Sequence, residues 1–178
     1  MALLISLTAC GKSAPAVSAP VPADAPVSAG FNGTDLAWLQ LMVPMTENAV
    51  ELLRLTPDHG DNPALTAATT KIAESENATL ARLRALRDRA GLPASNVHEG
   101  HRMPGMVTPA DLVVMRDSRG AEFDQRLLAL VGAHLDQAGV LARGEQQSGQ
   151  DGESKSLAAE IARDWAPQRE DLTRLGKT

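Results

Sequence analysis

The spacing of hydrophobic residues from Gly120 to Leu141 is that of an amphipathic helix. Apolar side chains recur every three or four positions, the period that gathers them on one face of a helix. They are Phe123, Leu127, Leu130, Val131, Leu135, Ala138 and Leu141. His134 lies within this apolar stripe. A histidine at such a position is predicted to point into a core, where it is either a packed residue with a partner or a ligand.

The same period and recognisable caps predict further helices along the chain. Asn62 and Thr108 each precede a proline, which is typical of a helix start because the side chain caps the helix and proline fits its first position. The predicted helices cover residues 34–56 (with Asn32 or Thr34 as cap), 63–89, 109–117, 122–143 and 154–175. Turns or loops are predicted at residues 57–61, 92–107 and 145–152, and no segment is predicted to be a strand.

An internal repeat organises these helices. A shift of 89 residues aligns Asp35 with Asp124 and Ile72 with Ile161, and one register holds over two helices and the turn between them. We therefore predict an all-α domain of two repeated helical hairpins, joined by a loop and a short extra helix. Four long amphipathic helices bury their stripes best as a four-helix bundle.

The N-terminal segment is predicted to be a targeting signal rather than a folded element. Residues 1–10 are apolar and end in the sequence LTAC, which resembles a bacterial lipoprotein signal with Cys10 as the lipidated residue. Residues 11–30 are rich in Ala, Pro, Ser and Val and predict an extended linker. Residues 31–178 are expected to form the domain. The mature protein is then expected to be lipid-anchored through Cys10 at the extracytoplasmic face of the cell membrane.

Charge and composition narrow the classes of function. The net charge of −5 argues against nucleic acid and against an anionic membrane surface as the main partner. Cys10 is the only cysteine, so the predicted domain has no disulfide and no thiolate chemistry. The sequence carries no nucleophilic triad order, Gly-rich phosphate loop or zinc spacing, and we expect no enzymatic activity.

Three motifs are distinctive: GAEFDQRLLALVGAHLDQA at 120–138, MPGM at 103–106 followed by TPADL, and LMVPMTENAVEL at 41–52. They resemble the bacterial domain of unknown function 305 family, and the resemblance covers residues 31–175. The resemblance implies a ferritin-like helical bundle that is secreted or membrane-anchored, and some members are linked to copper binding. In the family, the first and fourth helices, counting the short one, each carry a pair of adjacent histidines.

This chain departs from the family pattern at the histidine pairs. Met45-Thr46 stands where the first pair would be, and His134-Leu135 stands where the second would be. The family's Gln and Glu positions on the second helix of each hairpin also differ. They hold Glu76, Trp165, Thr79 and Gln168. Glu76 falls in an apolar stripe and is predicted to be buried.

Met45 and His134 are equivalent in the 89-residue repeat and could therefore face each other across the core. Met42 lies about one turn before Met45 on the same helix face. Thioether and imidazole groups suit Cu(I), which is soft and tolerates a low coordination number. The alternative is that both methionines fill the core and that His134 is a core histidine with one hydrogen-bond partner.

The loop at residues 98–106, HEGHRMPGM, is a second candidate site. It contains His98, His101, Met103 and Met106, and its glycines and proline let the chain fold back so that these side chains converge. Such a loop could bind Cu(I), or Cu(II) through the imidazoles. The alternative is that MPGM is a structural turn and that both histidines are solvated.

Two functional hypotheses follow from the sequence. The first is a cell-surface lipoprotein whose helical domain binds copper through the His/Met loop, with Met42, Met45 and His134 as further candidate ligands. The second is a metal-free structural or protein-interaction module of the cell envelope, with a protein partner that the sequence does not identify.

Overall fold

The computed structural model describes residues 30–96, 98, 100 and 102–177, which form helices and loops without a strand. The helices are α1 (Gly33–Leu53), α2 (Thr56–His59), α3 (Pro63–Arg89), α4 (Pro109–Asp117), α5 (Gly120–Ser148) and α6 (Gly152–Leu175). The predicted all-α class is confirmed. Cys10, the predicted linker up to residue 29 and His101 lie outside the described residues, so the roles given to them stay predictions.

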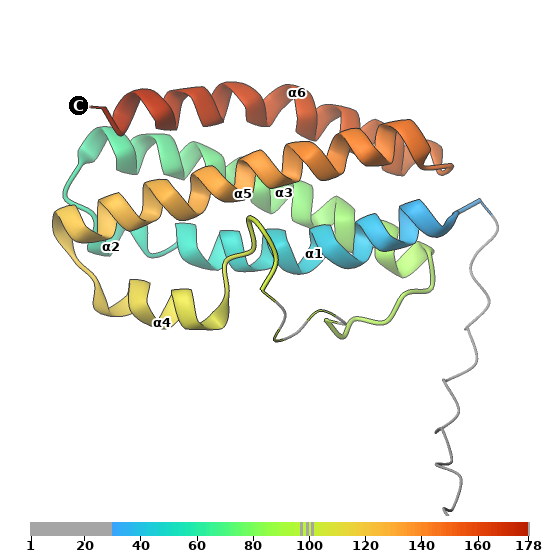
Figure 1. Ribbon diagram of the computed structural model, residues 1–178, viewed down its shortest axis with the longest axis horizontal. Helices are drawn as coiled ribbons and strands as arrows, with labels where there is room; N and C mark the ends of the chain where they lie inside the picture. Colours follow the sequence, from blue (N-terminus) through green and yellow to red (C-terminus); the bar gives the residue numbers. More distant parts are fainter. Residues whose placement is uncertain (1–29, 97, 99, 101, 178) are drawn as a thin grey trace, which may run out of the picture.

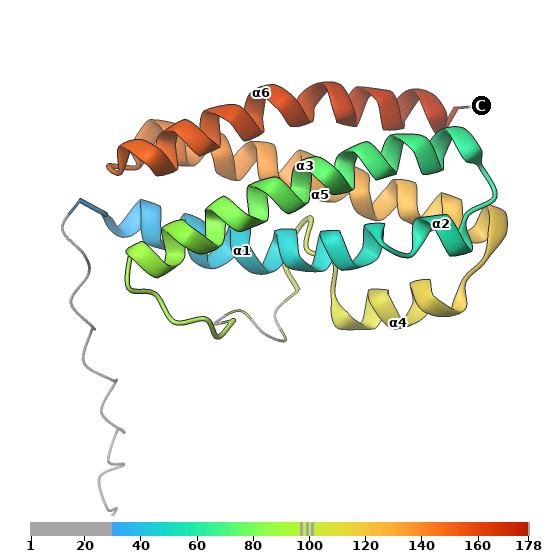
Figure 2. The same cartoon turned by 180° about the vertical axis from the view of Figure 1, so that it is seen from behind.

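The four long helices form an antiparallel bundle of two hairpins (Figures 1 and 2). Helices α1 and α3 make the first hairpin, and α5 and α6 make the second. The hairpins join where α1 packs on α5 and α3 packs on α6. Each long helix therefore contacts two others and buries its apolar stripe between them. This is the bundle that the internal repeat predicted.

The connection between the hairpins has to run along the bundle, because α3 ends at one end and α5 begins at the other (Figure 1). Helix α4 forms part of this connection and packs against both α1 and α5. The long linking segment thus lies beside the middle of α1, which is where the candidate His/Met loop is found. Among the described residues, no helix combines the length and the hydropathy that a bilayer span requires.

Side-chain caps start the helices where the sequence predicted them. Asn62 Oδ1 accepts hydrogen bonds from two backbone N–H groups of α3, at 3.0 and 3.2 Å, and Pro63 occupies the first position of the helix. Thr108 and Asp111 form a reciprocal capping box at the start of α4. These local signals explain why the bounds of α3 and α4 agree with the prediction.

Two of the predicted turns are partly wrong. Residues 56–59 form the single helical turn α2, in which Pro57 takes an early position that needs no backbone donor. Helix α5 continues to Ser148 through residues predicted as a polar turn. Its last turn contacts the rest of the bundle, since Glu145 is buried and Gln146 Nε2 donates to the Ala158 carbonyl of α6 at 3.4 Å.

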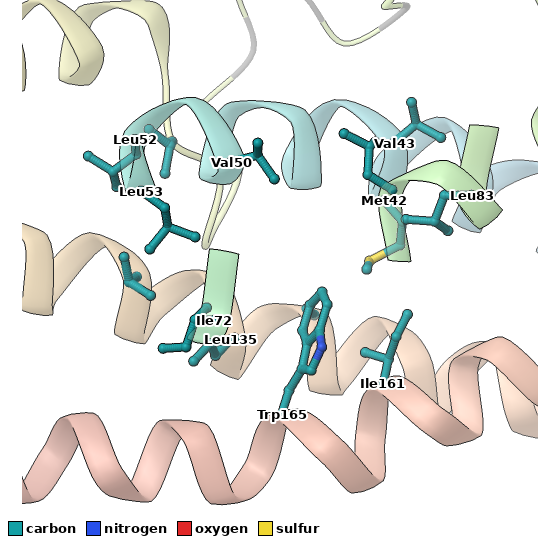
Figure 3. Packing of buried hydrophobic residues seen from close by; sticks show 14 of the residues in the cluster. Met42, Val43, Val50, Leu52, Leu53, Ile72, Leu83, Leu135, Ile161 and Trp165 are labelled. Atoms are coloured by element: carbon teal, nitrogen blue, oxygen red, sulfur yellow. The ribbon is translucent and has the colours of Figure 1, made fainter. Parts of the chain in front are cut away.

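Aliphatic side chains and Trp165 fill the space between the four long helices (Figure 3). Trp165 is 2% exposed, and Leu39 and Leu127 are fully buried. Burying a side chain of this size contributes about 1.5–3 kcal/mol before the entropy cost is subtracted. Polar residues with no exposed surface also lie in this interior: Asp35, Thr46, Thr69, Glu76, His134 and Ser154.

Candidate metal site

His134 projects from α5 into the interior of the bundle, and its side chain has no exposed surface. Its Nε2 atom lies 2.9 Å from Oε1 of Glu76 on α3, which is buried to the same degree. The ring of Trp165 on α6 lies against the imidazole, with centroids 5.6 Å apart and planes inclined at 40°. His134 therefore joins three helices, and the predicted burial of both His134 and Glu76 is confirmed.

The contact with Glu76 constrains the remaining ring nitrogen of His134. A carboxylate oxygen only accepts, so Nε2 carries the hydrogen when Glu76 is ionised, and Nδ1 then holds a lone pair. Neither Nδ1 of His134 nor Oε2 of Glu76 has a hydrogen-bond partner among the described residues. Metal-ligating histidines usually donate their other N–H to a carboxylate in this way. A packed core histidine with one partner has the same geometry, so both sequence interpretations remain compatible with it.

Met42 and Met45 on α1 are both fully buried. Figure 3 shows the sulfur of Met42 inside the bundle, on the side of α1 that faces Trp165. Methionine packs well into irregular core spaces because its side chain is unbranched and polarizable. Burial alone thus accounts for both residues. A copper role for Met42, Met45 and His134 stays a prediction.

The loop and the middle of α1 line a cavity of about 480 Å³. His98 and Met106 both line it, so the fold brings an imidazole and a thioether of the predicted loop to one space. Met103 is half-buried and is not among the residues that line the cavity. His101 lies outside the described residues. The structure therefore brings together two of the four predicted loop ligands.

Two contacts hold the end of the loop against the bundle. Asn48 Nδ2 of α1 donates a hydrogen bond to the Val107 carbonyl at 2.7 Å. Gly105 lies so close to α5 that an added Cβ would be 2.4 Å from Cβ of Gln137 and 2.6 Å from the Ala133 carbonyl oxygen. In Figure 1 the olive end of the loop crosses α1 and reaches α5. Met106 lies between these two contacts in the sequence and is therefore held in place, with 9% of its surface exposed.

Two of the side chains that line the cavity are donors suited to Cu(I). Within the part of the chain that the structure describes, no three His, Cys, Asp or Glu residues gather in a group that could hold a metal ion. Cu(I) accepts thioether sulfur and tolerates few ligands, so His98 and Met106 fit it.

Sequence reasoning missed several residues that shape the two candidate sites. It gave no role to Asn48, which anchors the loop, or to Arg102, which lines the cavity. It also missed that Glu76 is the partner of His134. The sequence offered one signal, the position of Glu76 in an apolar stripe, because a buried carboxyl group needs a polar partner.

The fold and these residues define a helical-bundle domain of two repeated hairpins with histidine and methionine near its long connection. The chain belongs to the DUF305 family, a domain of unknown function whose family model matches residues 35–177. The comparison with curated protein sequences found no match.

Three solved structures resemble the chain in fold. A presumed secreted DUF305 protein from Streptomyces coelicolor is 20% identical, with a TM-score of 0.70 over 80% of this chain and 91% of that one. A DUF305 fragment from Deinococcus radiodurans is 16% identical, with a TM-score of 0.74 over 83% and 97% of the two chains. CopM in its Cu(II)-bound form is 16% identical, with a TM-score of 0.69 over 80% and 95%. At such identities the likeness establishes the shared bundle.

Proposed function

We propose that this protein is an extracytoplasmic copper-binding domain that holds Cu(I) in the cavity between its loop and α1. His98 and Met106 supply the first two ligands, and His101 and Met103 complete the set when the metal is bound. The observation that carries the proposal is that His98 and Met106, separated in sequence, line the same cavity. The protein binds and holds the ion and catalyses no reaction.

The chemistry of the cavity supports Cu(I) as the occupant. Imidazole nitrogen and thioether sulfur are soft enough for Cu(I), and neither a neutral imidazole nor a thioether has to lose a proton to bind. The loop anchors at Asn48 and Gly105 limit the positions that Met106 can take, which lowers the entropy cost of closing the site. The Cu(II)-bound form of CopM, a protein with the same fold, adds support for copper as the metal.

The proposed location follows from the N-terminal sequence. Lipidation at Cys10 would tether the domain to the membrane, with residues 11–30 as a spacer, and the presumed secretion of the Streptomyces coelicolor relative is consistent with export. Metabolic labelling with a palmitate analogue tests this. Label should enter the wild-type protein and be lost in Cys10→Ser, whereas equal labelling of both would contradict the anchor.

A second candidate function is a metal-free module of the cell envelope, with an unidentified protein partner. The observation that favours it is the buried contact between His134 and Glu76, which gives the core histidine a partner without any metal. Under this hypothesis the loop is only a structural connection, and Met42, Met45 and His134 are packing residues.

Substitutions in the loop test where the metal binds. We expect His98→Gln combined with Met106→Leu to weaken Cu(I) binding by at least about tenfold, since losing even an indirect supporting residue of a metal site commonly costs that much. Leucine keeps the volume of Met106, which is almost fully buried, and this limits unfolding as an explanation. Unchanged affinity in this variant would contradict the loop site.

The matched control is His59→Gln combined with Met115→Leu, which changes the same residue types outside the cavity. It should leave Cu(I) affinity unchanged. A further variant, Met42→Leu with Met45→Leu, distinguishes a site in the loop from a site in the core. Loss of Cu(I) binding in this variant alone would indicate that the metal binds in the bundle interior.

A further inference from the structure

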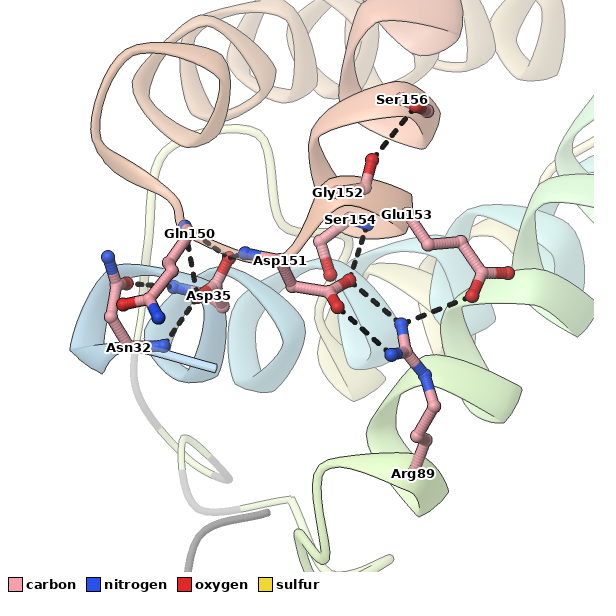
Figure 4. A network of polar contacts seen from close by, with 9 residues as sticks. All are labelled: Asn32, Asp35, Arg89, Gln150, Asp151, Gly152, Glu153, Ser154 and Ser156. Carbon is pink, nitrogen blue, oxygen red and sulfur yellow. Dashed lines mark hydrogen bonds and ion pairs between the residues drawn. The ribbon is translucent and has the colours of Figure 1, made fainter. Parts of the chain in front are cut away.

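Asp35 fastens the start of α1 to the turn between α5 and α6 (Figure 4). Its carboxylate is fully buried and accepts hydrogen bonds from the backbone N–H groups of Asn32, Gln150 and Asp151. The bonds from Gln150 and Asp151 are both 3.0 Å long. One side chain therefore caps its own helix and also holds the α5–α6 turn.

Glu145, near the end of α5, reaches the same place and is 1% exposed. Neither of its oxygens receives a hydrogen bond from an N–H or hydroxyl group of the described residues. An added Cβ on Gly149 would collide with Oε1 of Glu145, so this carboxyl group lies against the turn that Asp35 holds. There the carboxyl group of Asp35 is the group that can share a hydrogen bond with it. Carboxylate oxygens only accept, so this bond requires one proton between the two groups.

The surroundings decide which carboxyl group keeps the proton. Burial, followed by the hydrogen bond and charge of Asp35, raises the pKa of Glu145 to about 8. Burial also tends to raise the pKa of Asp35, but hydrogen bonds from Glu145 and the backbone outweigh it and lower that pKa. Glu145 is therefore the protonated member near neutral pH, and Asp35 is the carboxylate.

Other charged groups at this end of the bundle are largely paired among themselves. Arg89 of α3 binds Asp151 at 2.8 Å and Glu153 at 3.1 Å. Lys155 of α6 donates from Nζ to the Gly149 carbonyl at 3.1 Å, and its charge only partly offsets the effects on Glu145. A second negative charge on Glu145 would thus meet Asp35 and Asp151 with little compensation.

We propose that Asp35 and Glu145 form a pH-sensitive lock between the start of α1 and the α5–α6 turn, closed by a shared proton and released at alkaline pH. Loss of the shared proton leaves two buried carboxylates side by side, and their repulsion opens this end of the bundle.

The lock gives the stability of the protein a definite dependence on pH. The folded chain keeps a proton on Glu145 that the unfolded chain loses near the ordinary glutamate value of 4.5. The unfolding equilibrium constant should therefore rise with pH from about 5 to 8, by up to about tenfold per pH unit, and level off above that range.

The test is urea unfolding of the full-length protein from pH 5 to 9, for wild type, Glu145→Gln and Glu153→Gln. The amide of Glu145→Gln can donate to Asp35 without titrating, so this variant should lose the rise. Glu153→Gln removes an exposed carboxylate at the same end, 60% accessible, and should keep it. A rise in Glu145→Gln equal to that in wild type would overturn the proposal.

A second measurement needs no variant. The backbone amides of Gln150 and Asp151 donate to Asp35, so their hydrogen exchange in the wild-type protein reports opening of the lock. Above about pH 7 their exchange should accelerate more steeply with pH than that of amides in the middle of α5. Equal pH dependence for both sets of amides would also overturn the proposal.

Discussion

The imidazole of His134 and the carboxylate of Glu76 meet at 2.9 Å between Nε2 and Oε1, with both side chains fully enclosed by the bundle. The two residues come from different hairpins, α5 and α3. The hydrogen bond between the two side chains offsets the cost of burying each polar group. It also links the two hairpins of the repeat.

Removing one member of this pair should destabilise the fold strongly. We expect Glu76→Ala to lower the free energy of unfolding by about 3 kcal/mol, because it leaves His134 buried without its partner. Glu76→Gln should cost much less, since its amide oxygen can still accept from Nε2–H. Urea unfolding of both variants measures the difference.

Glu74→Ala is the matched control, because Glu74 is exposed on the same helix. It should change stability by no more than about 0.5 kcal/mol. Equal effects of Glu74→Ala and Glu76→Ala would mean that the buried contact contributes nothing.

The close approach of Gly105 to α5 predicts a steric effect separate from backbone strain. Gly105 and Gly100 both have positive φ, +70° and +79°, but only Gly105 has neighbours that an added Cβ would meet. Gly105→Ala should therefore cost about 2 kcal/mol more than Gly100→Ala, through displacement of the loop from α5. Chemical denaturation of the two variants gives this difference directly, and similar losses would argue against a tight fit.

Asn48 is expected to position the loop rather than to bind metal. Asn48→Ala removes its hydrogen bond to the Val107 carbonyl and should destabilise the protein by about 1 kcal/mol. It should also weaken Cu(I) binding, because Met106 adjoins that carbonyl. Asn77→Ala, which removes an exposed bond within α3, should leave copper affinity unchanged. A loss of stability without any loss of copper affinity would show that the Asn48 hydrogen bond does not support the metal site.

Acid should weaken the end of the bundle where Asp35 and Asp151 lie. Hydrogen bonds lower the pKa of both carboxyl groups against the opposing effect of burial. Their stabilising contribution is therefore present above the ordinary aspartate pKa and is lost as pH falls through the lower folded values. Unfolding from pH 5 to 2 should show this loss in wild type and a shallower one in Asp35→Asn. An identical acid dependence in the two proteins would contradict it.

Much of the fold was predictable because it depends on local signals. The apolar period, the caps at Asn62 and Thr108 and the repeat together specify a four-helix bundle. The last turn of α5 was not predicted, because its polar residues are typical of a turn. The contacts that keep them helical come from other parts of the bundle. Glu145 is buried in that turn beside Asp35, which lies far away in the sequence.

The candidate sites were predictable only in part. Burial of His134 follows from its position in the apolar stripe, but its partner is 58 residues away and depends on how the hairpins pack. The loop composition indicated copper chemistry, and the fold gathers His98 and Met106 at one cavity. Met103 is not among the residues that line that cavity. The sequence could not show this, because a loop of glycine and proline has no period from which side-chain directions can be inferred.

The most direct test of the account is a Cu(I) titration of the purified protein under reducing conditions, against a chromophoric chelator of known affinity. The account predicts uptake of one Cu(I) per chain that withdraws metal from the chelator, and loss of that uptake in His98→Gln with Met106→Leu. Failure of the wild-type protein to compete with even a weak chelator would contradict copper binding and favour a metal-free module.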